Sequence, residues 1–170
     1  MSVIGLVEID LNQGMAIIRG MSSIPINQLI EKIINAVEKR VPDYLAIEED
    51  RKSNDGNSAL CIIDEAGVVY GKMFGTDKIR QRQVFRIAWM KASQVWITGM
   101  QTGEFEKLVF TGQIDERQYG IMRPDFIGWL GGQPVAVDGK TKLSVGFSGF
   151  RGTTDLEIVQ KAVADVLAEK

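Results

Sequence analysis

The 170-residue chain contains no histidine and one cysteine, Cys61. The lack of histidine excludes Ser-His-Asp and Cys-His catalysis, imidazole general bases and histidine metal ligands. A single cysteine cannot form an intramolecular disulfide, and it leaves a structural zinc site short of ligands. We therefore predict no metal site, and a bound haem would need an axial ligand other than histidine. Cys61 lies in the apolar run ALCII, which predicts a buried thiol rather than a nucleophile.

An excess of one charge and long apolar segments are also missing. The formal net charge is −2, so we expect no general attraction to nucleic acid or to an anionic membrane. Polar residues interrupt the hydrophobic runs before they reach the length that spans a bilayer. The first residues, MSVIGLVEID, lack the basic start and the cleavage site of a signal peptide. We predict a cytoplasmic globular protein that binds neither nucleic acid nor membrane.

The first half of the chain alternates between hairpins and a helix. Residues 3–18 have the period of two short strands and predict a β-hairpin within residues 1–20. An amphipathic helix is expected after Pro25, and Pro42 is expected to end it. The wholly polar residues 48–57 predict an exposed, mobile loop. Residues 59–63 predict a strand buried on both faces, followed by a turn at 64–67 and a second strand.

The second half begins with a long basic helix, expected over residues 78–99. We expect a short helix at 103–110, irregular chain at 111–132, and strands at 134–138 and 142–148. A capping box from Thr154 to Glu157 predicts the start of the last helix. The order of elements predicts an α+β fold, with helices packed on a central antiparallel sheet. The three tryptophans are expected in the core, with interface anchoring as the alternative: Trp89, Trp96 and Trp129.

Residues 131–150, GGQPVAVDGKTKLSVGFSGF, are rich in glycine. They match neither a P-loop nor a dinucleotide-binding fingerprint, because strands flank them where those motifs need a helix. The simplest interpretation is a hairpin whose glycines permit positive φ or close approach of backbone. The alternative is that the bare backbone faces a flat or small ligand, whose carboxylate its N–H groups could hold.

The same residues resemble the closing signature of the GlcG/HbpS family, which includes the C-terminal domain of PduO-type proteins. That signature is a Gly-Gly-x-Pro strand, an Asp-Gly turn, a Gly-x-Ser-Gly strand end and an acidic residue opening the last helix. Lys91-Ala92 resembles the family's Lys-Ala step. The resemblance covers residues 26–170 and implies a profilin-like domain over 21–170, with residues 1–20 as an addition. It also implies homo-oligomers and a pocket near the long helix and the glycine-rich strand ends. The histidine that ligates haem in some relatives is missing here.

Our first hypothesis is a protein that binds haem or a related small organic anion. Arg82 and Arg86 would pair with carboxylates, and Met73 would approach the ligand. The pocket wall would come from the end of the glycine-rich segment: Gly132, Gly146, Ser148 and Gly149.

Two alternatives stay open. The first is an enzyme on the same scaffold, an isomerase, cyclase or lyase acting on a small metabolite. Without histidine its acid–base groups would be Lys91, Tyr119 and Asp64, although Asp64 could equally cap a turn. The second is a non-catalytic accessory subunit, in which the N-terminal hairpin offers sheet edges to a neighbouring chain.

Overall fold

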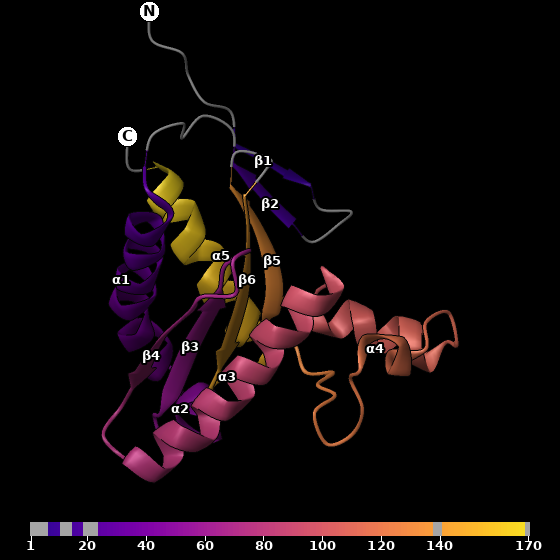
Figure 1. The fold of residues 1–170 in the computed structure, drawn as a ribbon. Coiled ribbons are helices and arrows are strands. Elements are labelled where there is room, and N and C mark those ends of the chain that lie inside the picture. Colours follow the sequence, from indigo (N-terminus) through magenta and orange to yellow (C-terminus); the bar gives the residue numbers. More distant parts are fainter. Residues whose placement is uncertain (1–6, 11–14, 19–23, 138–140, 169–170) are drawn as a thin grey trace, which may run out of the picture.

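The structure, a computed structural model, describes residues 7–10, 15–18, 24–137 and 141–168. A six-stranded sheet in the order β1-β2-β5-β6-β3-β4 carries helices on both faces (Figure 1). The predicted α+β class is therefore confirmed. No helix among these residues is long and apolar enough to cross a bilayer.

Four antiparallel strands form most of the sheet: β3 (Ser58–Ile63), β4 (Val69–Phe74), β5 (Gly132–Val137) and β6 (Thr141–Ser148). β1 (Val7–Asp10) and β2 (Met15–Ile18) pair antiparallel with each other, and β2 lies parallel to β5. The four central strands are antiparallel, as predicted, whereas the added strand β2 joins their edge in parallel. A long connection separates β2 from β5, which is what parallel pairing needs. Residues 1–6, 11–14 and 19–20 of the predicted hairpin segment lie outside the described residues.

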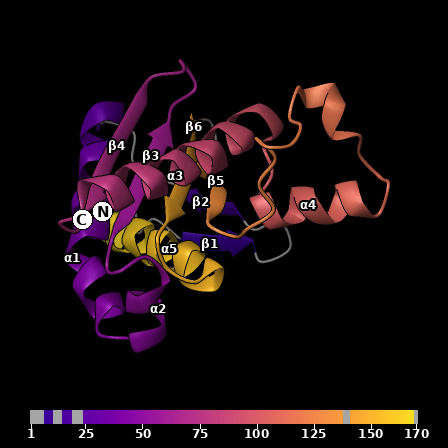
Figure 2. The ribbon, with the colours of Figure 1, turned by 90° about the horizontal axis from the view of Figure 1, so that it is seen from below.

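The sheet lies between two layers of helices (Figure 2), and a cluster of buried hydrophobic residues fills each interface. α1 (Ile26–Leu45) and α5 (Gly152–Ala168) cover one face, and α3 (Lys78–Thr98) crosses the other. Leu60 and Ile62 of β3 join the core beneath α1 and α5, whereas Ala59 and Cys61 face α3. Cys61 is fully buried, as predicted, and burial raises its pKa to about 12.

Two predictions about the first half were wrong. α1 continues past Pro42 to Leu45, because Tyr44 is buried and stacks on Phe150, which holds the last turn against the core. Residues 48–57 are not simply an exposed loop. They include a short helix, α2 (Glu48–Ser53), whose Asp50 side chain has no exposed surface.

Asp50 is buried because it binds the start of α5. Its carboxylate accepts hydrogen bonds from the backbone N–H and the guanidinium of Arg151 and from the Thr154 hydroxyl, at 2.9–3.1 Å. Burial by itself would raise the pKa of Asp50, but these hydrogen bonds hold it below its usual range. α5 consequently begins at Gly152, and the predicted capping box at Thr154 does not form.

The other helical predictions are confirmed. α3 ends one residue before the expected position, and α4 (Thr102–Phe110) projects away from the sheet in Figure 1. A 3-10 turn, η1 (Glu116–Tyr119), interrupts the irregular segment. The expectation that the tryptophans are core residues was wrong: Trp89, Trp96 and Trp129 are 45%, 48% and 67% exposed.

Candidate functional site

The glycines of the β5–β6 hairpin allow α3 to lie against the sheet. A Cβ on Gly146 would sit 2.1 Å from the Ala88 carbonyl oxygen, and one on Gly132 would sit 3.2 Å from Lys91. Gly149 has a φ of +138°, and a Cβ there would collide with Ser58 of the neighbouring strand. The space beside these three glycines is therefore filled by protein. The expected wall of bare backbone does not form at Gly132 and Gly146.

Lys91 and Asp155 form a buried ion pair between α3 and the first turn of α5. Lys91 Nζ lies 2.8 Å from Asp155 Oδ2 and 2.8 Å from the Phe147 carbonyl oxygen, and both side chains are at most 3% exposed. The backbone N–H of Phe150 donates to the other Asp155 oxygen. Burial lowers the pKa of Lys91 and raises that of Asp155 to about 6, while their mutual attraction opposes both shifts.

This pair lines a cavity of about 350 Å³, the polar cavity, on one flank of α3. Three further residues line the same cavity: Ser148 at the end of β6, Gly152 at the start of α5, and Trp129. The cavity lies where the resemblance predicted a pocket, beside the long helix and the end of the last strand. Of the predicted site residues, it brings together Lys91 and Ser148.

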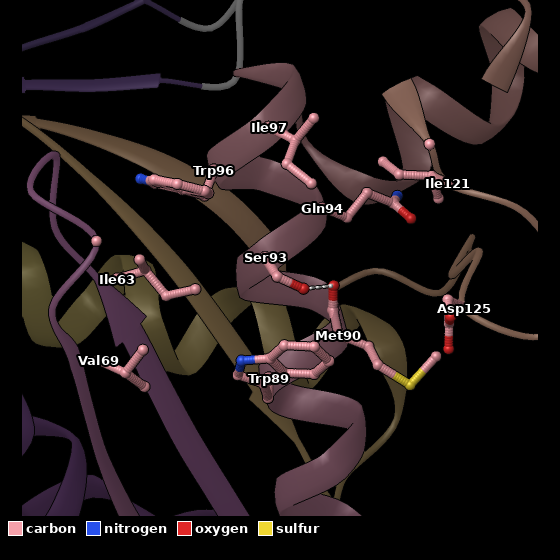
Figure 3. Close-up of a pocket in the computed structure, with 12 residues that line it drawn as sticks. Ile63, Val69, Trp89, Met90, Ser93, Gln94, Trp96, Ile97, Ile121 and Asp125 are labelled. Carbon is pink, nitrogen blue, oxygen red and sulfur yellow. Dashed lines mark hydrogen bonds between the residues drawn. The ribbon is translucent and has the colours of Figure 1, made fainter. Parts of the chain in front are cut away.

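The outer face of α3 forms the floor of a second hollow, the apolar groove, of about 370 Å³. Figure 3 shows Trp89, Met90 and Ile97 projecting from α3 between two walls. Ile63 and Val69 of the β3–β4 hairpin form one wall, and Ile121 and Asp125 of the irregular segment form the other. Trp89 and Trp96 follow the helical period of a core stripe, which is why the sequence predicted them in the core. In the structure this stripe faces the groove and not the sheet.

Gln94 holds the irregular segment over α3 and was not identified from the sequence. Its amide donates to the Ile127 carbonyl at 2.8 Å and accepts from the Ile127 N–H at 3.0 Å. The side chain is 2% exposed. Thr102 adds a hydrogen bond from its hydroxyl to the Trp129 carbonyl at 2.7 Å. Gln94 therefore fixes the segment that supplies one wall of the groove. In the sequence, its place as a polar residue within an apolar helical stripe could have indicated a buried hydrogen-bonding role.

The three predicted acid–base residues do not line a common cavity. Only Lys91 lines one of the two hollows. Asp64 caps the β3–β4 turn, because its carboxylate accepts from the Val68 N–H at 2.9 Å and from the Tyr70 hydroxyl. Tyr119 is half-buried and packs edge-on against Phe105, with ring centroids 5.5 Å apart.

The predicted cationic and thioether residues are exposed. Met73 lies on the edge strand β4, 48% exposed, and lines neither hollow. Arg82 and Arg86 are exposed on α3 and form no ion pair within the described part of the chain. Arg86 precedes Trp89 by three residues and Met90 by four, so it lies on the same helix face as the apolar groove.

Three solved structures superpose on most of this chain. The Klebsiella pneumoniae protein ORFY, of the DUF336 family, superposes with a TM-score of 0.63 at 18% identity, covering 90% of this chain and 99% of that one. The PduOC–haem complex gives 0.61 at 17% identity, covering 84% and 94%. A double mutant of Streptomyces reticuli HbpS gives 0.57 at 18% identity, covering 86% and 89%.

The chain has the GlcG/HbpS fold. The resemblance carried by the glycine-rich segment is thus confirmed as a likeness of structure. No protein-family model and no curated protein sequence matches the chain.

One of these neighbours, PduOC, was solved as a complex with haem. Two indoles and several aliphatic side chains line the apolar groove. Met90, 4% exposed, offers a thioether, a known axial ligand of haem iron. Among the described residues no lysine or arginine lines the groove.

Proposed function

We propose that the apolar groove binds a flat, largely apolar organic anion, with haem as one member of that class. The observation that carries the proposal is the pair of half-exposed indoles, Trp89 and Trp96, beside Met90 in one hollow. Exposed tryptophans on a concave apolar surface are typical of ligand sites, since aromatic side chains offer large stacking faces.

The anionic character is inferred from α3. Arg82 and Arg86 lie one turn apart on the groove side of the helix, with no acidic partner in the described residues. A carboxylate of a groove-bound ligand would pair with Arg86, which is nearest to Trp89 along the helix. The enzyme alternative has less support, because Lys91, Tyr119 and Asp64 do not share a cavity.

The test is an absorbance titration with hemin and with metal-free protoporphyrin IX. We expect saturable binding of both, weakened about tenfold by Trp89→Ala and about threefold by Arg86→Gln. Met90→Leu should keep protoporphyrin binding and remove the thioether-dependent change in the hemin spectrum.

Trp129→Ala is the matched control, since this exposed indole lies outside the groove. Suberate is the control ligand, because it has two carboxylates and no ring. The proposal fails if neither porphyrin binds saturably, or if Trp89→Ala and Trp129→Ala weaken binding equally.

The domain boundaries, the oligomeric state and the location that the resemblance implies belong to the same proposal. We infer a profilin-like domain over residues 21–170, with an N-terminal hairpin extension over 1–20, and a cytoplasmic homo-oligomer that acts as an accessory ligand-binding protein. The parallel pairing of β2 with β5 supports the extension, because it adds two strands at one sheet edge. Light scattering on the full chain measures the subunit number.

A further inference from the structure

The polar cavity contains hydrogen-bonding groups that no described residue satisfies. Lys91 Nζ has three N–H groups, of which Asp155 and the Phe147 carbonyl accept two. Ser148, 7% exposed, makes no side-chain hydrogen bond within the described residues, and it lines the same cavity. Donors that face a cavity without a protein partner are available to a ligand or to ordered water.

The geometry favours an acceptor as the ligand. Asp155 already receives the Lys91 ammonium on one oxygen and the Phe150 N–H on the other. The groups left over are the third N–H of Lys91 and the Ser148 hydroxyl. Gly152 also lines the cavity at the first residue of α5, where backbone N–H groups and the helix dipole favour negative charge.

The fold protects this arrangement at Gly131. Its φ is +112°, and a Cβ there would lie 2.8 Å from Lys91 Nζ and 2.7 Å from Asp155 Cβ. A side chain at this position would therefore press on both members of the ion pair. The volume of about 350 Å³ is at the small end of the range for ligand sites.

We propose that the polar cavity is a second ligand site, which binds the carboxylate of a small organic acid through the Lys91 ammonium and the Ser148 hydroxyl. Trp129 and Ile87 also line the cavity and would contact the carbon skeleton. This site is separate from the apolar groove, with which it shares no lining residue.

The experiment follows the indole N–H signals of the full chain in ¹H–¹⁵N spectra while acetate, glycolate and pyruvate are added. The three tryptophans report on the two sites separately, because Trp129 lines the polar cavity and Trp89 and Trp96 line the groove. We expect a saturable shift of the Trp129 signal alone with at least one acid, and none with the neutral isostere acetamide. Porphyrin binding should instead move the signals of Trp89 and Trp96, so the two proposals fail independently.

Ser148→Ala should weaken acid binding about tenfold, since a hydrogen bond to a charged group is lost. Ser144→Ala is the control: Ser144 is equally buried on β6 and lines neither hollow, so its affinity should change less than about twofold. The proposal is overturned if none of the three acids gives a saturable shift at Trp129. It is also overturned if Ser148→Ala binds as tightly as Ser144→Ala, because the site then holds water only.

Discussion

Gly146→Ala tests whether the glycine-rich hairpin serves packing or ligand contact. The new Cβ would lie 2.1 Å from the Ala88 carbonyl oxygen and 2.7 Å from the Ala92 nitrogen, whereas ordinary contacts begin near 3.4 Å. Both neighbours are backbone atoms of α3, so no side chain can rotate away. The helix must move off the sheet by about an ångström, and overpacking of this kind costs about 3 kcal/mol.

In a chain of 170 residues that loss corresponds to a fall in Tm of about 6–12 °C. Thermal and urea unfolding followed by circular dichroism, at one protein concentration, measure it. Gly152→Ala is the control, because its Cβ would meet Leu130 at 3.4 Å and its φ is not positive, so we expect less than about 1 kcal/mol. A stable Gly146→Ala protein with weakened ligand binding would refute the packing explanation.

Four further predictions concern buried side chains. Asp50→Ala should lower the free energy of unfolding by about 2–3 kcal/mol, because it removes hydrogen bonds at the start of α5, and Asp50→Asn should lose less. Gln94→Leu should cost about 2 kcal/mol and speed hydrogen exchange at the Ile127 amide, whose acceptor it removes. Cys61 should react with a thiol reagent only after unfolding, since its pKa is about 12 and it is fully buried. Asp155 has a folded pKa of about 6 against 3.8 for the free side chain, so its contribution to stability is complete below about pH 4. That contribution is lost as pH rises through about 6, by up to about 3 kcal/mol, and Asp155→Asn should abolish this loss.

Each of these predictions has a control or a contradicting result. Glu49→Gln and Gln83→Leu, at exposed positions, should each change stability by less than about 0.5 kcal/mol. Rapid modification of Cys61 in the folded protein would contradict its burial. A difference in stability between wild type and Asp155→Asn that stays constant from pH 4 to 7 would contradict the raised pKa of Asp155.

Hydropathy patterns predicted most of the helices and strands, although not α2, and they identified one residue of a cavity wall. Strand and helix positions follow from period and from turn residues, and the Gly-x-Ser-Gly ending led to the correct fold. Lys91 was identified because a charged residue interrupts an apolar stretch of α3. Lys91 is buried in the structure, where Asp155 neutralises its charge.

The remaining features depend on contacts between distant residues. Asp50 looks like one carboxylate of a solvated run, yet it binds Arg151, which lies 101 positions later. Trp89 and Trp96 follow the helical period of a core stripe, but the irregular segment and the β3–β4 hairpin turn that stripe into a groove. Local pattern cannot distinguish a helix face that meets a sheet from one that lies beside a hollow.

The pairing of β3 has a consequence for synthesis of the chain. β3 meets β4 at once, but its other neighbour, β6, follows it by more than eighty residues. While the polypeptide leaves the ribosome, the buried residues Leu60 and Ile62 stay without their partner strand on one side, and exposed apolar strands of this kind are prone to aggregation. Translation must therefore pass Ser148 before this nascent chain can pair both edges of β3.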